Sequence, residues 1–171
     1  MTLKWSVPDL MPYKNEGLTL DETIELPEMS EQDDEIRDLS PIRITGFAEV
    51  KARLISFHLT LKGKMVLPCS ITLKNVDQPF EVHTSETFRL DSSLDLEDGH
   101  GEEIHDVDNQ VIDLIPFIKE AILVEKPIRV VSEEAKNQPK PEGKGWEVVT
   151  DEERKNRIDP RLEKLKQFYD D

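Results

Sequence analysis

The clearest pattern in the chain is a regular alternation of apolar and polar residues between Pro41 and Cys69. Such alternation places every second side chain on the same face of a β-strand. The apolar positions are even-numbered up to Ala52 and odd-numbered from Ile55 onward. A phase change of one residue indicates a turn or a bulge between Arg53 and Ile55, so this region contains at least two strands.

Further strands are predicted on both sides of this region. Residues Leu18–Leu26 favour one strand, and Lys62-Gly63-Lys64 is typical of a turn that precedes another strand over Met65–Leu73. Asn75–Pro79 breaks the pattern, and Phe80–Leu90 predicts a fourth strand or a hairpin. Several strands joined by short turns predict an α+β fold with an antiparallel sheet, with a barrel-like curl as one option.

Helices are expected at three places around this sheet. Residues 1–16 contain two prolines and favour a short capped turn or helix, with Trp5 and Leu10 on the core. A short acidic helix is expected over residues 30–38. Apolar residues between Val111 and Lys126 follow helical spacing and predict a longer helix that Pro127 ends.

The C-terminal part of the chain has a different composition. Residues 131–149 are mostly polar and include proline and glycine, which is typical of a linker. Asp159-Pro160 is a helix start, and the residues after it carry one apolar stripe. We therefore expect a core domain over residues 1–130 and a helical segment over 150–171 that packs on this core.

Composition limits the class of protein. The chain has 171 residues and a single cysteine, Cys69, which excludes an internal disulfide and a multi-cysteine zinc site. No apolar run approaches the roughly 18 residues that a membrane span needs. The N-terminus lacks the charged and apolar regions of a secretory signal. These observations predict a soluble cytoplasmic protein that is not embedded in a membrane.

The net charge of −15 is concentrated in two acidic stretches that correspond to predicted loops near residues 28–38 and 91–109. Residues 21–38 hold nine acids and one base, and residues 91–108 hold eight acids and no lysine or arginine. Dense negative charge repels phosphate and attracts basic proteins or cations. The candidate docking residues for a basic protein are Asp33, Asp34, Glu35, Glu102, Glu103, Asp106 and Asp108.

A basic strand face gives a second candidate surface. Arg43, Lys51 and Arg53 share the polar phase of their strand with Phe47. Cations contact phosphates and an aromatic ring stacks on bases, so such a face suits RNA. A solvated outer face of a sheet has the same pattern, and the sequence does not separate the two interpretations.

The residues that could carry catalysis or bind a metal form no known signature. Cys69 has no implied activating partner, and the acidic stretch with His100 and His105 matches neither an EF-hand loop nor HExxH. No phosphate-binding loop, dinucleotide fingerprint or nucleophile elbow is present. We therefore expect no enzymatic activity and no cofactor; a metal-dependent nuclease using residues 97–108 is the least favoured alternative.

Several short motifs resemble the YceD family of large ribosomal RNA subunit accumulation proteins. They are Leu67-Pro68-Cys69-Ser70-Ile71-Thr72-Leu73 with Pro79-Phe80-Glu81-Val82, then Ile112-Asp113-Leu114-Ile115-Pro116, and finally Asp159-Pro160-Arg161-Leu162. The resemblance implies a bacterial, non-enzymatic factor needed for 23S rRNA to accumulate in large-subunit assembly. Many relatives carry a second cysteine where this chain has Thr72, so zinc binding of that kind is not expected here.

Charge and resemblance combine into one hypothesis. An acidic protein starts poorly as a general RNA binder, because RNA affinity depends on cationic contacts. It can instead shield a basic ribosomal protein by imitating the negative potential of RNA. We therefore predict that the acidic stretches dock a basic ribosomal protein or a pre-50S particle. The alternative is direct binding of 23S rRNA by Arg43, Phe47, Lys51 and Arg53.

Overall fold

The structure is a computed structural model that describes residues 3–91, 104–107, 109–138 and 142–147. The chain divides into two compact units, Met1–Ser132 and Glu133–Asp171. In the second unit, α4 (Glu133–Lys136) precedes an antiparallel pair of short strands, β9 (Glu142–Gly143) and β10 (Trp146–Glu147). The helical segment expected over 150–171 lies outside the described residues, so its packing on the core stays a prediction.

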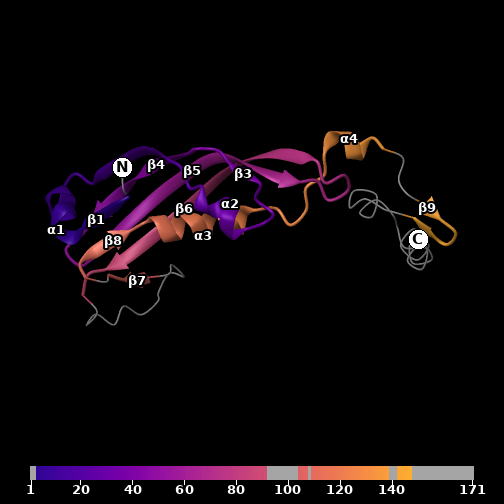
Figure 1. The fold of residues 1–171 in the computed structure, drawn as a ribbon. Helices are drawn as coiled ribbons and strands as arrows, with labels where there is room; N and C mark the ends of the chain where they lie inside the picture. Colours follow the sequence, from indigo (N-terminus) through magenta and orange to yellow (C-terminus); the bar gives the residue numbers. More distant parts are fainter. Residues whose placement is uncertain (1–2, 92–103, 108, 139–141, 148–171) are drawn as a thin grey trace, which may run out of the picture. The chain divides into compact units, whose positions relative to one another are not determined.

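The first unit is built on a six-stranded sheet (Figure 1). Its main path runs in the order β2 (Leu18–Ile24), β4 (Ile42–Val50), β5 (Leu54–Pro68), β6 (Asn75–Arg89) and β7 (Ile104–Asp106), and the short β3 (Asp38–Leu39) pairs with β5. The α+β class is thus confirmed. The antiparallel description is wrong at one edge, because β7 runs parallel to β6. The sheet is open rather than a closed barrel, since no described residue joins β2 to β7.

The phase change near Arg53 is confirmed, because β4 ends at Val50 and β5 begins at Leu54. The predicted turn at Lys62-Gly63-Lys64 is wrong, since β5 continues through it to Pro68. Gly63 instead leaves room for the Phe80 ring, because a Cβ at this position would lie 2.8 Å from a ring carbon of Phe80. The expected break at residues 75–79 is also wrong, because they form the start of β6.

The N-terminal segment lies at one end of the sheet and contains the expected short helix, with Trp5 and Leu10 on the core (Figure 1). It contains β1 (Lys4–Ser6), α1 (Val7–Leu10) and a 3-10 turn, η1 (Met11–Lys14). The Trp5 ring stacks on Phe57 with the ring centroids 5.7 Å apart, and Leu10 is fully buried. β1 also pairs with β8 (Val111–Asp113), which is why the predicted longer helix begins later than Val111.

Two helices pack on the buried face of the sheet, which we call the inner face; the opposite face is the outer face. α3 (Ile115–Glu125) lies along the long strands and buries Ile118 and Ile122 (Figure 1). The acidic helix α2 (Glu28–Gln32) begins before the predicted residue 30 and buries Met29. No helix in the described parts of the chain is long and apolar enough to span a membrane.

Candidate partner-docking site

Three of the predicted docking acids form a turn that follows α2. The backbone becomes extended at Asp33, and its carboxylate accepts a hydrogen bond of 2.9 Å from the Glu35 backbone nitrogen. The turn exposes Asp34 and Glu35 while the next residue, Ile36, is buried. We call Glu31, Asp33, Asp34 and Glu35 the acidic patch.

Lys126, which directly follows α3, neutralises part of this patch. The Lys126 Nζ lies 2.6 Å from an Asp33 carboxylate oxygen and 2.7 Å from a Glu35 carboxylate oxygen. The hydrogen bond from Lys126 lowers the pKa of Asp33, and the same contacts raise the pKa of Lys126. Within the described residues, no cation pairs with Glu31 or Asp34, so the patch keeps a negative excess.

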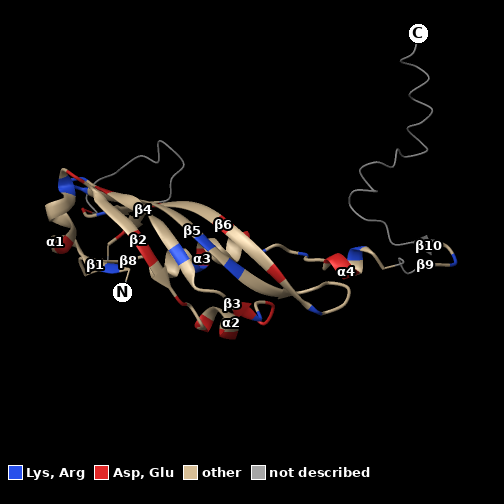
Figure 2. Cartoon of the chain, turned by 90° about the horizontal axis from the view of Figure 1, so that it is seen from above, with Lys and Arg blue, Asp and Glu red and all other residues tan. Residues whose placement is uncertain are grey.

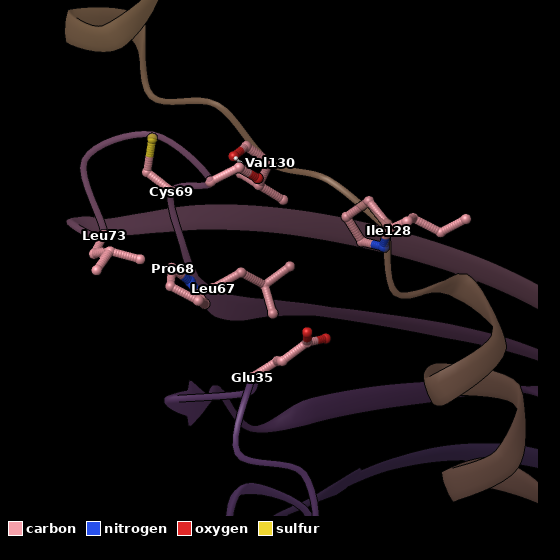
Figure 3. Close-up of a pocket in the computed structure, with 9 residues that line it drawn as sticks. Glu35, Leu67, Pro68, Cys69, Leu73, Ile128 and Val130 are labelled. Carbon is pink, nitrogen blue, oxygen red and sulfur yellow. Dashed lines mark hydrogen bonds between the residues drawn. The ribbon is translucent and has the colours of Figure 1, made fainter.

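Two grooves border the acidic patch. The first is lined by Met29, Gln32, Asp33, Asp34 and Leu123. The second is lined by Glu35 and by residues of the β5–β6 hairpin and of the segment after α3 (Figure 3). Figure 3 shows the Glu35 carboxylate directed up toward Leu67, with Ile128 on the neighbouring segment. Apolar surface with an acidic rim suits a partner segment that is both basic and apolar.

The second acidic stretch is described only in part. Glu102, Glu103 and Asp108 lie outside the described residues, so their role stays a prediction. Asp106 ends β7, where its carboxylate pairs with the Arg89 guanidinium at 2.7 Å. The structure therefore places Asp106 on a different element from the acidic patch and already gives it a cationic partner.

The predicted RNA-contact residues lie on or beside the outer face of the sheet. Arg43 and Phe47 are exposed on β4, while Lys51 and Arg53 belong to the turn between β4 and β5. Arg43 donates two hydrogen bonds, of 3.0 and 2.9 Å, to the carboxylate of Asp21, which raises the pKa of Arg43. These residues share a surface, but the guanidinium of Arg43 is already paired with the Asp21 carboxylate.

Most cations of this outer face are paired with acids, and the two kinds of charge alternate across the strands (Figure 2). Lys51 pairs with Glu49 at 3.1 Å, Lys62 with Glu81 at 3.1 Å and Lys64 with Asp77 at 2.8 Å. Since phosphate affinity depends on cations that displace counterions, this pairing weakens the case for RNA binding.

Aromatic rings also gather on the outer face. Phe47 is 49% exposed and contacts the ring of His58 at a tilt of 34°, with the centroids 4.8 Å apart. His58 contacts Ser85 at 2.9 Å and His83 contacts Thr60 at 3.0 Å across the strand pairs. The sequence places His58 on a polar strand face but cannot reveal this cluster, because the register of the strands is not visible in it.

The other reactive side chains occupy structural positions. The Cys69 sulfur accepts hydrogen bonds from the backbone nitrogens of Ser132 at 3.3 Å and Thr72 at 3.5 Å. These contacts lower the pKa of the buried thiol to about 6. His105 pairs with Glu86 at 2.8 Å between two phenylalanine rings. The described residues contain no cluster of three potential metal ligands, and His100 lies outside them.

Comparison with known proteins identifies the family. Over 168 residues, the chain is 39% identical to the uncharacterized protein YlbN of Bacillus subtilis (strain 168). The alignment covers 97% of this chain and 96% of that protein. No solved structure matches the chain. Residues 57–169 match the family described as large ribosomal RNA subunit accumulation protein YceD, and the chain belongs to this family.

Proposed function

We propose that this protein is a non-enzymatic factor needed for the accumulation of 23S rRNA in large-subunit biogenesis, and that it acts by docking a basic ribosomal protein. The family supports the process, since it is named for the accumulation of large ribosomal subunit RNA. The observation that carries the docking step is the acidic patch. Residues 28–38 contain six acids and one base, and Glu31 and Asp34 are exposed without a cationic partner in the described chain.

The physical advantage of such a surface lies in charge imitation. A ribosomal protein that folds against RNA carries many cations, which attract any polyanion before assembly. An acidic surface neutralises these cations and steers the encounter with the partner. Surface charge contacts are weakened by salt and are therefore easily exchanged. Ribosomal RNA can displace the factor because its phosphates compete for the same cations.

The test is a crosslinking pull-down of the tagged protein from growing bacteria, which identifies RNA and protein at low and moderate salt. The variant Glu31→Lys with Asp34→Lys reverses two unpaired charges. Its matched control, Asp9→Lys with Glu16→Lys, makes the same change in net charge at two exposed carboxylates elsewhere that have no cationic partner among the described residues. A third variant reverses Glu102, Glu103, Asp106 and Asp108, which tests the second acidic stretch.

We expect the patch variant to lose a basic ribosomal protein and to lower 23S rRNA when it replaces the wild-type gene. The matched control should retain both. Unchanged capture of ribosomal proteins by the patch variant and by the variant of the second stretch would refute docking on acidic surfaces.

Direct rRNA binding is the alternative, and one observation favours it. Phe47 presents half of its ring surface to solvent on a sheet face that no described element covers. Under this alternative, Arg43→Glu with Arg53→Glu abolishes RNA crosslinks and leaves protein capture intact. Under the docking proposal, the same variant leaves protein capture and 23S rRNA levels unchanged.

A further inference from the structure

Large apolar side chains are exposed beside the acidic patch. Leu123 at the end of α3 is 41% exposed, Leu73 in the β5–β6 hairpin is 66% exposed, and Ile128 is fully exposed. Leu123 lines the first groove, whereas Leu73 and Ile128 line the second. Apolar side chains that gather around grooves mark interaction surfaces more often than isolated ones do.

Leu73 is held outward by its backbone. Its φ of 58° is in the left-handed region, which a branched side chain rarely adopts. The conformation is fixed on both sides, because the Leu73 nitrogen donates to the Cys69 carbonyl at 2.9 Å and the Leu73 carbonyl accepts from Arg37 at 2.8 Å. Backbone strain of this kind is found at binding sites, where the surrounding contacts maintain it.

The acidic patch connects the two grooves. Asp33 lines the first groove and Glu35 lines the second, and both carboxylates bind the same ammonium group of Lys126. None of the described residues that line either groove is a lysine or an arginine. The grooves therefore combine apolar walls with the carboxylates of Asp33, Asp34 and Glu35 and with neutral polar side chains, and this chemistry is complementary to a basic segment that carries apolar side chains.

We infer that the two grooves and the acidic patch form one docking surface for a Lys/Arg-rich segment of a large-subunit ribosomal protein, which inserts an apolar side chain into each groove. This inference rests on the proposed function. It adds which surface of the protein docks the segment and which apolar side chains anchor it. The cations of the segment contact Glu31 and Asp34, while Leu73, Leu123 and Ile128 contact its apolar side chains. Buried apolar anchors supply most of the affinity of an interface, and its charges supply mainly orientation and encounter rate.

Site-specific photocrosslinking tests this surface in the full-length protein. A benzophenone-bearing amino acid replaces Leu123 in the first groove or Leu73 in the second, and Phe47 on the outer sheet face is the matched control position. The probe is the mixture of proteins extracted from purified large ribosomal subunits. We expect crosslinks from both groove positions to one Lys/Arg-rich segment, at a yield about tenfold above that of the control. Equal crosslinking yields at all three positions would overturn the inference. Crosslinks from the groove positions to a second copy of the protein, to another part of the same chain or to RNA would also overturn it.

A charge-neutral variant separates this inference from the proposed function. Leu73→Ser with Leu123→Ser alters one exposed side chain in each groove, and its unfolding midpoint serves as the control for folding. We expect it to lower capture of the crosslinked protein about tenfold without changing the salt dependence, whereas the Glu31→Lys, Asp34→Lys variant weakens that dependence. If only the charge variant loses capture, the apolar anchors are refuted while the proposed function stands. If neither loses capture, this docking surface is refuted, and the proposed function is refuted with it when the variant of the second acidic stretch also retains capture.

Discussion

Lys126 has opposite effects on stability and on partner binding, and its replacement by methionine separates them. Methionine keeps most of the apolar stem and removes the charge. The Asp33 contact is the stronger one, since the two side chains are only 22% and 18% exposed, while Glu35 is largely exposed. A charged hydrogen bond at a partly buried site contributes about 1.5–3 kcal/mol, and an exposed ion pair less than about 1 kcal/mol. We expect Lys126→Met to lower the free energy of unfolding by about 2 kcal/mol.

The pH dependence of this loss follows from the two pKa shifts. Lys126 lowers the pKa of Asp33 in the folded protein, so the pair stabilises above the unfolded value of about 3.9 and is lost as pH falls through the folded value. The raised pKa of Lys126 has the opposite sign: its contribution is present below about 10.4 and is lost as pH rises through the folded value. The difference between wild type and variant should be constant from about pH 5 to pH 10 and shrink outside that window.

Partner binding should change in the other direction. The variant leaves the acidic patch with one more net negative charge, so a basic partner should bind more tightly and with a steeper salt dependence. Urea unfolding monitored by tryptophan fluorescence measures stability, and capture of the basic ribosomal protein measures binding. Lys62→Met is the control, because Lys62 and Glu81 are both about half exposed and lie on the outer sheet face. A variant that loses stability and capture together, or that loses neither, would refute this reasoning.

Three further substitutions test the fold around the site by urea unfolding. Gly46→Ala places a Cβ 2.0 Å from the His58 carbonyl oxygen, so we expect a loss of about 3 kcal/mol, against little change for Thr45→Ala on the opposite face of β4. Leu73→Gly relieves a positive φ and should raise stability by about 0.5–1 kcal/mol while it lowers partner capture. Cys69→Ser removes a thiol whose pKa is lowered to about 6; folding stabilises the thiolate, so the stability lost in the variant should grow as pH rises from 6 to 8.5. A constant loss across that pH range would contradict the thiolate assignment.

The local pattern of the sequence predicts the strands where one face is buried and the other polar. The phase change near Arg53 identifies the β4–β5 turn because burial forces the two faces to differ. The pattern fails at Gly63 and at Asn75–Pro79, where turn-forming residues occur inside strands. There the glycine accommodates the Phe80 ring and Pro79 lies at an exposed strand position, neither of which is visible without the partner strand.

The candidate site is predictable only in its charge. The acidic composition near residues 28–38 identifies the patch, but the cation that holds Asp33 comes from a residue 93 positions away in the chain. The grooves are likewise formed by α2, the hairpin and the segment after α3. The pairing of charges on the outer face could not be predicted either, because the contact of Arg43 with Asp21 depends on the register of β2 and β4.

The β5–β6 hairpin is longer than the sheet that supports it, and this has a consequence for its motion. β4 pairs with β5 only from Ile55 to Lys62, and beyond that point no long strand lies beside β5: the two residue pairs of β3 and individual hydrogen bonds from Arg37 and Ser132 hold the hairpin instead. Two-stranded ribbons are marginally stable in water, so the outer half of the hairpin can open without global unfolding. Backbone amides near its tip should exchange with solvent deuterium much faster than those of Ile55–Leu61. A partner seated against Leu73 would slow that exchange, which turns the hairpin tip into a reporter of docking.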